Sequence, residues 1–263
     1  MAEARIPLIE TVDLKKYFKV GDKSYLHAVD GINMKVYPGE TIGVVGESGC
    51  GKSTLGRTIL RLIEPTSGQI LYNGEDITKL NARQMKRMRQ EMQIIFQDPY
   101  ASLDPRRSVI EIIAEYMIIN KTLPTKREIF NRAAHLMDVV GLARRYATAY
   151  PHELDGGRRQ RIGIARALSV NPKFIVCDEP VSALDVSIQA QILNLLMDLQ
   201  DEMGLTYMFV THDLSVVKHI SNNIVVMYLG QCLEFASSDE LFASPVHPYT
   251  KALLSAIPEP EKS

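Results

Sequence analysis

Residues 46–54 read GESGCGKST, a stretch whose residue types and spacing suit the binding of a phosphate chain. It fits the pattern G-x-x-x-x-G-K-[ST], in which the glycines are Gly46 and Gly51. Glycines allow consecutive backbone amides to turn toward an anion, and the positive end of a following helix adds to the attraction. Lys52 would supply a mobile cation to the β- and γ-phosphates, and the Ser53 hydroxyl would bind Mg²⁺. The alternative is a glycine-rich turn that binds nothing, with Cys50 as a small filler rather than a redox group.

A pair of acidic residues, Asp178 and Glu179, ends the apolar stretch FIVCDEP at residues 174–180. A buried strand here would deliver Asp178 to the carboxyl edge of a sheet, where it would hold Mg²⁺ directly or through water. Glu179 would polarise the attacking water as a general base. Two acids at the end of a strand also occur in ordinary turns, so this interpretation depends on the phosphate-binding pattern earlier in the chain.

His212 and Gln97 also follow short apolar stretches, in FVTHD and IIFQDP. A lone histidine is usually structural, but its position at the end of a strand on the expected catalytic edge favours a role beside the terminal phosphate. Gln97 would reach both the metal and the nucleotide.

The stretch ELDGGRRQR at residues 153–161 places Gly156 and Gly157 at the start of an expected helix. Asp155 before them serves as a helix N-cap as well as serine does. As a phosphate ligand it is poor, because it has no proton to donate near neutral pH. Two like unit charges ~4 Å apart at an effective dielectric of ~20 repel by roughly 4 kcal/mol. Arg158, one helical turn on, would offset that charge or pair with the phosphate itself.

Short apolar stretches alternate with helical patterns, which predicts an α/β fold. Residues 41–45, 174–177 and 207–210 are apolar on both faces, as are strands of a parallel sheet covered by helices. Residues 187–203 have apolar positions at helical spacing, and Gly204 is a suitable stop.

The middle of the chain is predicted to be a helical insert. Residues 106–118 and 125–140 fit helices, and Thr125 with Glu128 has the spacing of a capping box. Residues 1–40 carry alternating strands of an expected antiparallel sheet, and the end of the chain reads as a short appendage.

Composition restricts the class of protein. Of 263 residues, 30 are basic and 31 acidic, and the net charge of −1 does not favour a nucleic-acid partner. Cys50, Cys177 and Cys232 form no CxxC pair, which argues against disulfides or a zinc site and favours a reducing cytoplasm. No stretch reaches the ~18 apolar residues that span a bilayer, so we expect membrane attachment only through partners.

Together these stretches resemble the ATP-binding subunits of ABC transporters. GESGCGKST resembles the Walker A loop, FIVCDE the Walker B strand, LDGGR the signature sequence, and SALD, which contains Asp185, the D-loop. Gln97 and His212 are similar in position to the Q-loop glutamine and the switch histidine. Tyr17, in LKKYF, resembles the aromatic residue that stacks on adenine. Phe18 is its competitor, and a simple core aromatic is the alternative.

The resemblance implies an α/β, ABC-type P-loop NTPase fold, with a RecA-like parallel-sheet core, an antiparallel β subdomain and a helical insert. Residues 1–96 and 166–230 would form the core with the β subdomain, 97–165 the helical subdomain, and 231–263 a short C-terminal segment.

The implied cofactors are ATP and Mg²⁺. Lys52, Asp178, Glu179 and His212 would converge on the terminal phosphate. The implied catalytic residues are Lys52, Gln97, Glu179 and His212. The implied metal ligands are Ser53, Gln97 and Asp178. The implied ATP contacts are Tyr17, Gly46, Glu47, Ser48, Gly49, Cys50, Gly51, Lys52, Ser53, Thr54, Gln97, Asp155, Gly156, Gly157, Arg158 and Asp185.

A subgroup is also indicated. QDPYASLDPR, DEPVSALDVSIQAQILNLL and HPYTKALLSAIPEP resemble the dipeptide/oligopeptide transport ATPases, and the F-type subunit most closely. This implies an ATPase that powers peptide uptake at the cytoplasmic face of a bacterial membrane. Its implied partners are a second, D-type ATP-binding subunit, two membrane permease subunits and an external substrate-binding protein. The chain stops soon after HPYT, so we expect the longer tail and the iron–sulfur cluster of some members to be absent from it.

Asp155 and Arg158 depart from the usual family signature LSGGQ. In family dimers each ATP lies between the Walker A loop of one subunit and the signature of the other. We therefore expect a heterodimer in which the site completed by LDGGR binds ATP but hydrolyses it slowly. The alternative is that Asp155 swings away, Arg158 compensates, and both sites work.

Other functions stay open at this point. Nickel chelates or oligosaccharides are alternative cargoes of the same importer class. A weakly hydrolytic regulatory subunit, a soluble ABC-type ATPase of DNA repair or translation, and a P-loop small-molecule kinase are the remaining alternatives.

Overall fold

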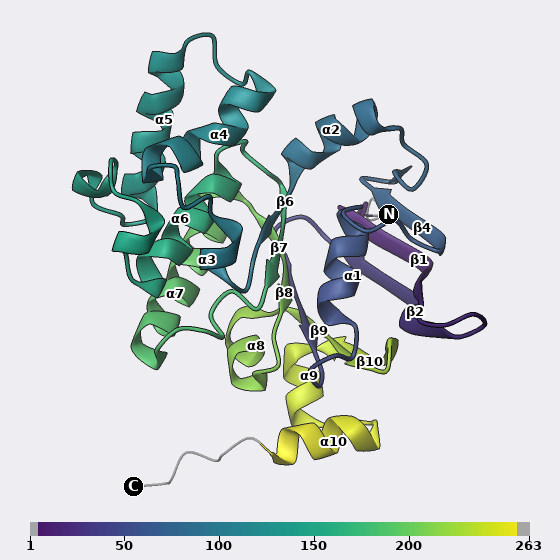
Figure 1. The fold of residues 1–263 in the computed structure, drawn as a ribbon. Helices are drawn as coiled ribbons and strands as arrows, with labels where there is room; N and C mark the ends of the chain where they lie inside the picture. Colours follow the sequence, from purple (N-terminus) through teal and green to yellow (C-terminus); the bar gives the residue numbers. More distant parts are fainter. Residues whose placement is uncertain (1–4, 257–263) are drawn as a thin grey trace, which may run out of the picture. The chain divides into compact units, whose positions relative to one another are not determined.

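The computed structural model describes residues 5–256 of the chain (Figure 1). Two compact units are distinguished by their internal contacts, and each is described by itself. The first contains the residues up to Met85 and those from Thr206 onward, and the second is Lys86–Leu205. The end of the HPYTKALLSAIPEP stretch, from residue 257, lies outside the described residues.

The first unit contains an antiparallel sheet with the strand order β2-β1-β4-β5. Its strands are β1 (Ile9–Lys19), β2 (Tyr25–Val36), β4 (Ser67–Tyr72) and β5 (Glu75–Asp76). In the second half of β2, Ile32, Met34 and Val36 are buried, whereas Asn33 and Lys35 are exposed. This alternation, with a period of two, buries one face of the sheet and leaves the other face polar.

A second set of strands in the first unit follows the order β10-β9-β3-β8. They are β3 (Thr41–Val45), β8 (Thr206–Val210), β9 (Asn223–Tyr228) and β10 (Gln231–Ser237). β3 runs parallel to both β8 and β9, and β10 is antiparallel to β9. Every residue of β3 and β8 is buried, as expected for parallel strands covered on both faces.

The helices of the first unit are α1 (Lys52–Ile59), α8 (Leu214–Ile220), α9 (Ser238–Ala243) and α10 (Pro248–Ser255). α8 packs closely on β3, since a Cβ atom at Gly43 would lie only 2.3 Å from Val217 Cγ1. Leu241 of α9 is buried with Val45 and Val217, and Leu253 of α10 packs against the same cluster. Figure 1 shows α9 and α10, in yellow, following β10. The C-terminal helices are therefore part of the core of this unit.

The second unit combines a pair of parallel strands with a group of helices. The strands are β6 (Met92–Ile95) and β7 (Phe174–Asp178). The helices are α3 (Pro99–Ser102), α4 (Val109–Asn120), α5 (Lys126–Val139), η1 (Arg144–Tyr146), η2 (Pro151–Glu153), α6 (Gly156–Leu168) and α7 (Val186–Met203). α4, α5 and α6 pack against one another. Helix α2 (Ala82–Glu91) includes residues of both units.

The predicted strands at 41–45, 174–177 and 207–210 are confirmed as β3, β7 and β8, to within one residue at each end. The helix predicted at 187–203 is α7, and Gly204 ends it in the left-handed conformation at φ 64°.

The predicted capping box of α5 is also present. The Thr125 hydroxyl accepts a hydrogen bond from Glu128 N at 3.2 Å, and Thr125 N donates to Glu128 Oε2 at 3.0 Å. The helix predicted at 106–118 instead begins at Val109. Arg106 and Arg107 lie in a turn, because the backbone amides of both donate to Asp104.

Within residues 5–256, no helix has both the length and the apolar character needed to cross a membrane.

Candidate functional site

The loop at residues 46–51 connects β3 to α1 and requires glycine at both of its ends. Gly46 has φ 149° and Gly51 has φ 111°, a region that side chains rarely adopt. A Cβ atom at Gly46 would lie 2.2 Å from Met227 O, and one at Gly51 would lie 1.9 Å from Ala28 O. The pattern glycines are therefore fixed both by backbone conformation and by close backbone neighbours.

Lys52 is held inside this loop. The residue is only 4% exposed, and its Nζ donates to Gly46 O and to Glu47 O, both at 2.8 Å. Gly51, the N-cap of α1, has no side chain with which to cap the helix. A helix start of this kind, next to a lysine ammonium, suits an anion such as a phosphate. Ser53 and Thr54 lie in the first turn of the same helix.

Cys50 lies on the inner side of the loop. It is 6% exposed, its carbonyl accepts a hydrogen bond from Gly230 N at 2.9 Å, and burial raises the pKa of its thiol. A raised pKa keeps the thiol protonated at neutral pH, in agreement with its interpretation as a small filler. Ser48 and Gly49, on the outer side, are exposed.

His212 lies at the same sheet edge as the loop. Val44 of β3 pairs in register with Val210 of β8, so Gly46 and His212 each stand two residues beyond a paired position. Parallel strands present their carboxyl ends at one edge, where ligands of open α/β sheets bind. His212 is exposed there and directly precedes Asp213, the N-cap of α8. The structure thus brings the phosphate loop and His212 to one edge of the first unit.

Tyr17, on β1, takes part in a polar cluster with His27 and Asp30 of β2. Its hydroxyl donates to Asp30 Oδ1, and its ring stacks on His27 with centroids 3.9 Å apart. The hydrogen bond to Asp30 raises the pKa of Tyr17 to about 12, and the same bond lowers the pKa of Asp30.

This cluster is linked by hydrogen bonds to the phosphate loop. Asp30 N donates to Gly230 O at 2.8 Å, and Gly230 N donates to the carbonyl of Cys50. Phe18, the competing aromatic, instead lies under the Lys16 ammonium, 4.9 Å from Nζ. The connection to the loop favours Tyr17 over Phe18 as the base-stacking residue, and this assignment stays a prediction.

In the second unit, Gln97 and Glu179 meet at the carboxyl ends of β6 and β7. Ile95 pairs in register with Cys177, so each residue stands two positions beyond a paired one. Gln97 Nε2 donates to Glu179 Oε2 at 3.0 Å and to Ser182 Oγ at 3.4 Å. The Ser182 hydroxyl in turn donates to the Glu179 carbonyl at 3.1 Å.

The acidic pair differs in exposure and backbone. Asp178 is 1% exposed at the end of β7, whereas Glu179 is half-buried. Glu179 has φ 47°, a conformation uncommon for a residue with a side chain and typical of functional sites. This turn places the Glu179 carboxylate against the Gln97 amide.

Asp155 caps α6 as predicted. Its Oδ1 accepts a hydrogen bond from Arg158 N at 2.8 Å, and its Oδ2 accepts one from Arg158 Nη1 at 2.6 Å. The Arg158 guanidinium also lies 4.9 Å from the centre of the Tyr146 ring. The predicted ion pair therefore forms, and Arg158 is held between a carboxylate and an aromatic face.

A pocket of about 290 Å³ lies beside this ion pair, and Arg145, Tyr146, Asp155, Arg158 and Arg161 contribute to its lining. Hydrogen bonding to Arg145 lowers the pKa of Tyr146, and burial lowers the pKa of Arg161.

Gly156 and Gly157 give α6 a close approach to the segment that contains Asp185. A Cβ atom at Gly157 would lie 2.7 Å from Ile188 Cγ2, and one at Gly156 would lie 3.0 Å from Leu184 Cδ2. Asp185 is the N-cap of α7, and its carbonyl accepts from Gln189 N at 2.8 Å. The signature and D-loop stretches are thus packed together within the second unit.

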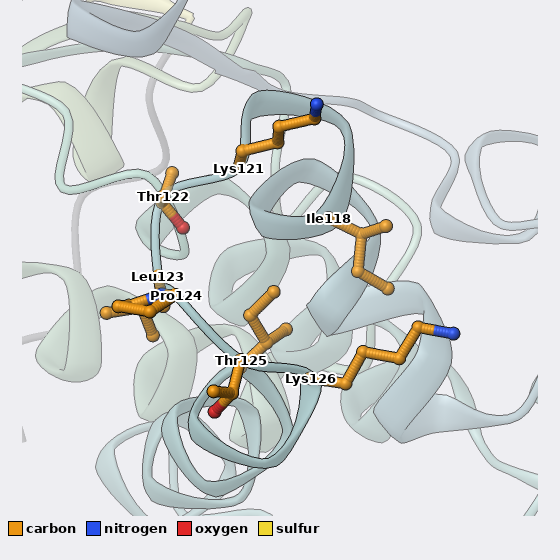
Figure 2. A pocket seen from close by; sticks show the side chains of 8 residues that line it. Ile118, Lys121, Thr122, Leu123, Pro124, Thr125 and Lys126 are labelled. Atoms are coloured by element: carbon orange, nitrogen blue, oxygen red, sulfur yellow. The ribbon is translucent and has the colours of Figure 1, made fainter.

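A larger pocket of about 450 Å³ in the second unit contains none of the predicted site residues. It lies between the end of α4 and the start of α5, and Figure 2 shows Ile118, Lys121, Leu123 and Lys126 around it. The two ammonium groups lie apart from each other in that view. They do not form one anion site.

Two residues in this geometry were not predicted to have a role. Asp30 anchors Tyr17, and the Tyr249 hydroxyl accepts a hydrogen bond from Glu47 N at 3.3 Å. Tyr249 lies in the HPYT motif, which in the sequence indicated only the family subgroup. Asp30 carries no local signal of its own.

Comparison with known proteins decides the family. The sequence profile described as ABC transporter matches residues 29–182. The chain belongs to the ABC transporter ATP-binding family. A second profile, described as oligopeptide/dipeptide transporter, C-terminal region, matches residues 233–263 of this ABC protein. The predicted resemblance and its subgroup are therefore confirmed.

Relatives of this ABC protein are close in sequence. It is 55% identical over 255 residues to the oligopeptide transport ATP-binding protein OppF of Bacillus subtilis, with 97% of this chain and 83% of that protein covered. It is 51% identical over 265 residues to the oligopeptide transport ATP-binding protein AppF of the same species, with 97% and 79% covered.

Solved structures agree with the fold. A dimeric, post-hydrolysis state of the ATP-binding cassette MJ0796 with ADP and Pi has a TM-score of 0.80 at 28% identity, covering 88% of this chain and 98% of that one. CbiO1 of Clostridium perfringens has a TM-score of 0.79 at 30% identity, with 91% and 92% covered. The predicted α/β P-loop fold of the ABC class is confirmed, and the chain is an ABC-type ATPase.

Proposed function

We propose that this ABC ATPase powers the import of peptides through membrane permease subunits that are separate chains. The match of residues 233–263 to the oligopeptide/dipeptide C-terminal region carries the proposal. The described part of that region packs into the core of the first unit, so it is integral to the fold. The relatives named for oligopeptide transport support the same cargo class.

ATP and Mg²⁺ are the proposed ligands of the phosphate loop. Ser53, Gln97 and Asp178 offer the hydroxyl, amide and carboxylate oxygens that a small hard cation prefers. The metal supplies charge stabilisation to the phosphates when it is bound. Lys52 contacts the β- and γ-phosphates, and the loop amides orient them.

Hydrolysis in this proposal depends on side chains that follow the carboxyl ends of β8 in the first unit and of β6 and β7 in the second. Glu179 accepts the proton of the attacking water, and Gln97 orients the Glu179 carboxylate through the contact at 3.0 Å. His212 steadies the terminal phosphate, and Tyr17 stacks on the adenine base. We keep the core at 1–96 and 166–230, the helical subdomain at 97–165 and the C-terminal segment at 231–263 as part of the proposal.

The permease partner is proposed to contact the surface at 100–107. Tyr100 is 52% exposed and lies 5.0 Å from the Arg159 guanidinium, which leaves an aromatic face accessible at this surface. This contact would place the chain at the cytoplasmic face of a bacterial membrane. An external substrate-binding protein completes the proposed importer.

The dimer partner is proposed to be a D-type paralogue, so that the two ATP sites differ. Asp155 offers a carboxylate where the family signature has a serine hydroxyl, and a carboxylate cannot donate a hydrogen bond to a phosphate. The 2.6 Å bond to Asp155 and the Tyr146 face engage Arg158, which weakens its ability to replace that donor. The site completed by LDGGR therefore binds ATP and hydrolyses it slowly.

The paired change Asp155→Ser with Arg158→Gln tests this asymmetry. In the complete transporter, ATPase activity per complex should rise as the slow site gains a hydroxyl donor. Unchanged activity would support two equivalent sites, with Arg158 as the compensating residue.

Cargo is tested with the complete complex in proteoliposomes. Peptides added with the substrate-binding protein should stimulate ATP hydrolysis, and Lys52→Ala should abolish the stimulation. Stimulation by nickel chelates or oligosaccharides alone would replace the peptide assignment. A chain that binds ATP without hydrolysing it in any complex would support a regulatory subunit.

A further inference from the structure

The HPYT motif, residues His247–Thr250, reaches the phosphate loop directly. Tyr249 lies in the first turn of α10, and its hydroxyl accepts the hydrogen bond from Glu47 N at 3.3 Å. The two residues are 202 positions apart in sequence. A motif of the C-terminal region thus makes a polar contact with the second residue of the loop.

Tyr249 and Lys52 contact the same peptide group. Tyr249 binds its N–H, and Lys52 binds its carbonyl. The peptide that joins Gly46 to Glu47 presents its carbonyl to Lys52 Nζ at 2.8 Å and its amide hydrogen to Tyr249. A peptide group is planar, so fixing the amide hydrogen also fixes the direction of the carbonyl. Tyr249 therefore sets the orientation of a group that positions the lysine of the phosphate loop.

The motif itself is anchored to β10. Glu234 Oε1 accepts from Val246 N at 2.7 Å, and Glu234 Oε2 accepts from His247 N at 3.0 Å. His247 Nδ1 accepts from Tyr249 N at 3.1 Å and caps α10. A single carboxylate thus holds the two residues that precede α10.

The Tyr249 ring packs against two sets of neighbours. It lies 4.7 Å from the Tyr228 ring, centroid to centroid, at the end of β9. It contacts the buried cluster that includes Val45 of β3 and Val217 of α8. Burial raises the pKa of its hydroxyl, which stays neutral and able to accept the Glu47 hydrogen bond at physiological pH.

We propose that Tyr249 is a positioning residue of the phosphate loop, through which the C-terminal segment increases affinity for the triphosphate. The inference rests on the proposed function, because it takes the loop to be the ATP site. It assigns to the HPYT motif a structural effect on nucleotide binding.

Tyr249→Phe tests the proposal, because it removes the hydroxyl and keeps the ring. The dissociation constants of Mg·ATP and of inorganic tripolyphosphate are measured by calorimetry on the full chain. Both should rise about fivefold, the effect of losing one ordinary hydrogen bond. In the complete transporter, KM for ATP should rise and kcat should stay within about twofold. Tripolyphosphate has no base, so an equal effect on both ligands locates the change at the phosphates.

Tyr228→Phe is the matched control, since it alters the partner ring and leaves the Glu47 contact in place. It should leave both dissociation constants unchanged. If Tyr249→Phe also leaves them unchanged, or if Tyr228→Phe weakens them equally, the proposal is overturned.

Glu234→Ala gives a second, independent measurement. It releases the motif from β10, so it should weaken binding to a similar extent and show little further loss when combined with Tyr249→Phe. Fully additive losses would contradict a shared route through Tyr249. A wild-type chain that binds neither ligand would contradict the proposed function itself, whereas wild-type binding with an unaffected Tyr249→Phe variant contradicts only this inference.

Discussion

Glu179 combines two features that separate it from an ordinary turn residue. Its backbone has φ 47°, and its carboxylate accepts a hydrogen bond from Gln97. Backbone strain of this kind persists only where the surroundings enforce it, and here β6 and β7 hold both residues at one edge. The position of the Glu179 carboxylate is therefore fixed by the ends of these two strands.

Glu179→Gln should abolish the general base and keep the shape of the side chain. We expect ATP hydrolysis to fall by about 10²–10⁴-fold while ATP binding persists. Single-turnover hydrolysis and equilibrium nucleotide binding check both parts. Glu202→Gln, an exposed change on α7, is the control. Fast turnover by the Glu179 variant would remove this residue from its assigned role.

The Tyr17–Asp30 bond gives a second prediction, visible in a titration. The Tyr17 pKa is raised to about 12, so the neutral phenol, and the stability it contributes, persists through neutral pH and is lost as the pH rises through that value. The lowered pKa of Asp30 adds stability that is lost only in acid. Asp30→Asn should bring the Tyr17 pKa down toward the ordinary tyrosine value.

Difference absorbance between each protein and its Tyr17→Phe counterpart isolates the Tyr17 titration from those of the other tyrosines. Asp30→Asn should also weaken ATP binding more than tripolyphosphate binding, because only ATP has a base to stack. An unshifted Tyr17 titration in the Asn variant would show that Asp30 does not control the phenol.

Candidate site residues could be selected from the sequence where their types and spacing form a local pattern. The loop glycines with Lys52, and the pair Asp178 and Glu179, lie in such short stretches. Asp30 and Tyr249 were missed, because their partners are 13 and 202 positions away in sequence. A local pattern carries no information about such contacts.

At the scale of elements, β3 and α8 are packed so closely that Gly43 leaves no room for a side chain. Gly43→Ala would place a methyl group 2.3 Å from Val217 Cγ1. We expect this overpacking to destabilise the protein by about 1–3 kcal/mol, as measured by denaturant unfolding.

Gly163→Ala is the matched control for that prediction. Gly163 lies inside α6, and apart from the nearby backbone of that helix no heavy atom of residues 5–256 lies within 4 Å of an added Cβ. Alanine is there expected to be neutral or to stabilise by about 0.5–1 kcal/mol. Equal destabilisation by both changes would show that the space around Gly43 does not limit packing.

Elements were predictable in proportion to their apolar periodicity. β3, β7 and β8 are buried on both faces, and their continuous apolar runs were sufficient. Helix α2 was not predicted, because Met85 is its one buried residue and only Ala82, Met85 and Met88 of its ten residues are apolar. The start of α4 was placed too early, because the turn around Asp104 is built from side-chain hydrogen bonds.

For the whole molecule, ligand binding should appear as stability. If the native chain alone binds Mg·ATP, a concentration about 100-fold above the dissociation constant adds about 2.7 kcal/mol. Thermal unfolding with and without Mg·ATP measures the shift. Lys52→Ala should remove most of it, and chelation of Mg²⁺ should reduce it. A shift that survives Lys52→Ala would place ATP elsewhere.

The strand order β10-β9-β3-β8 of the first unit could not be predicted from local patterns. It brings residues near position 45 beside residues near 210 and 225. The resemblance to a known family implied a parallel-sheet core, with Lys52 and His212 at one site, but no strand order. The participation of α9 and α10 in the core was likewise unforeseen, since the C-terminal segment reads as an appendage in sequence alone.

The sulfur of Cys50 offers a native probe of this protein. A Cβ atom at Gly46 would lie 2.9 Å from Cys50 Sγ, so little room separates the thiol from the loop backbone. Because the thiol is both covered and protonated, alkylating reagents should modify it only during brief openings of the loop. The rate of Cys50 alkylation, followed by mass spectrometry, would then time those openings without any introduced label, and Mg·ATP should slow it.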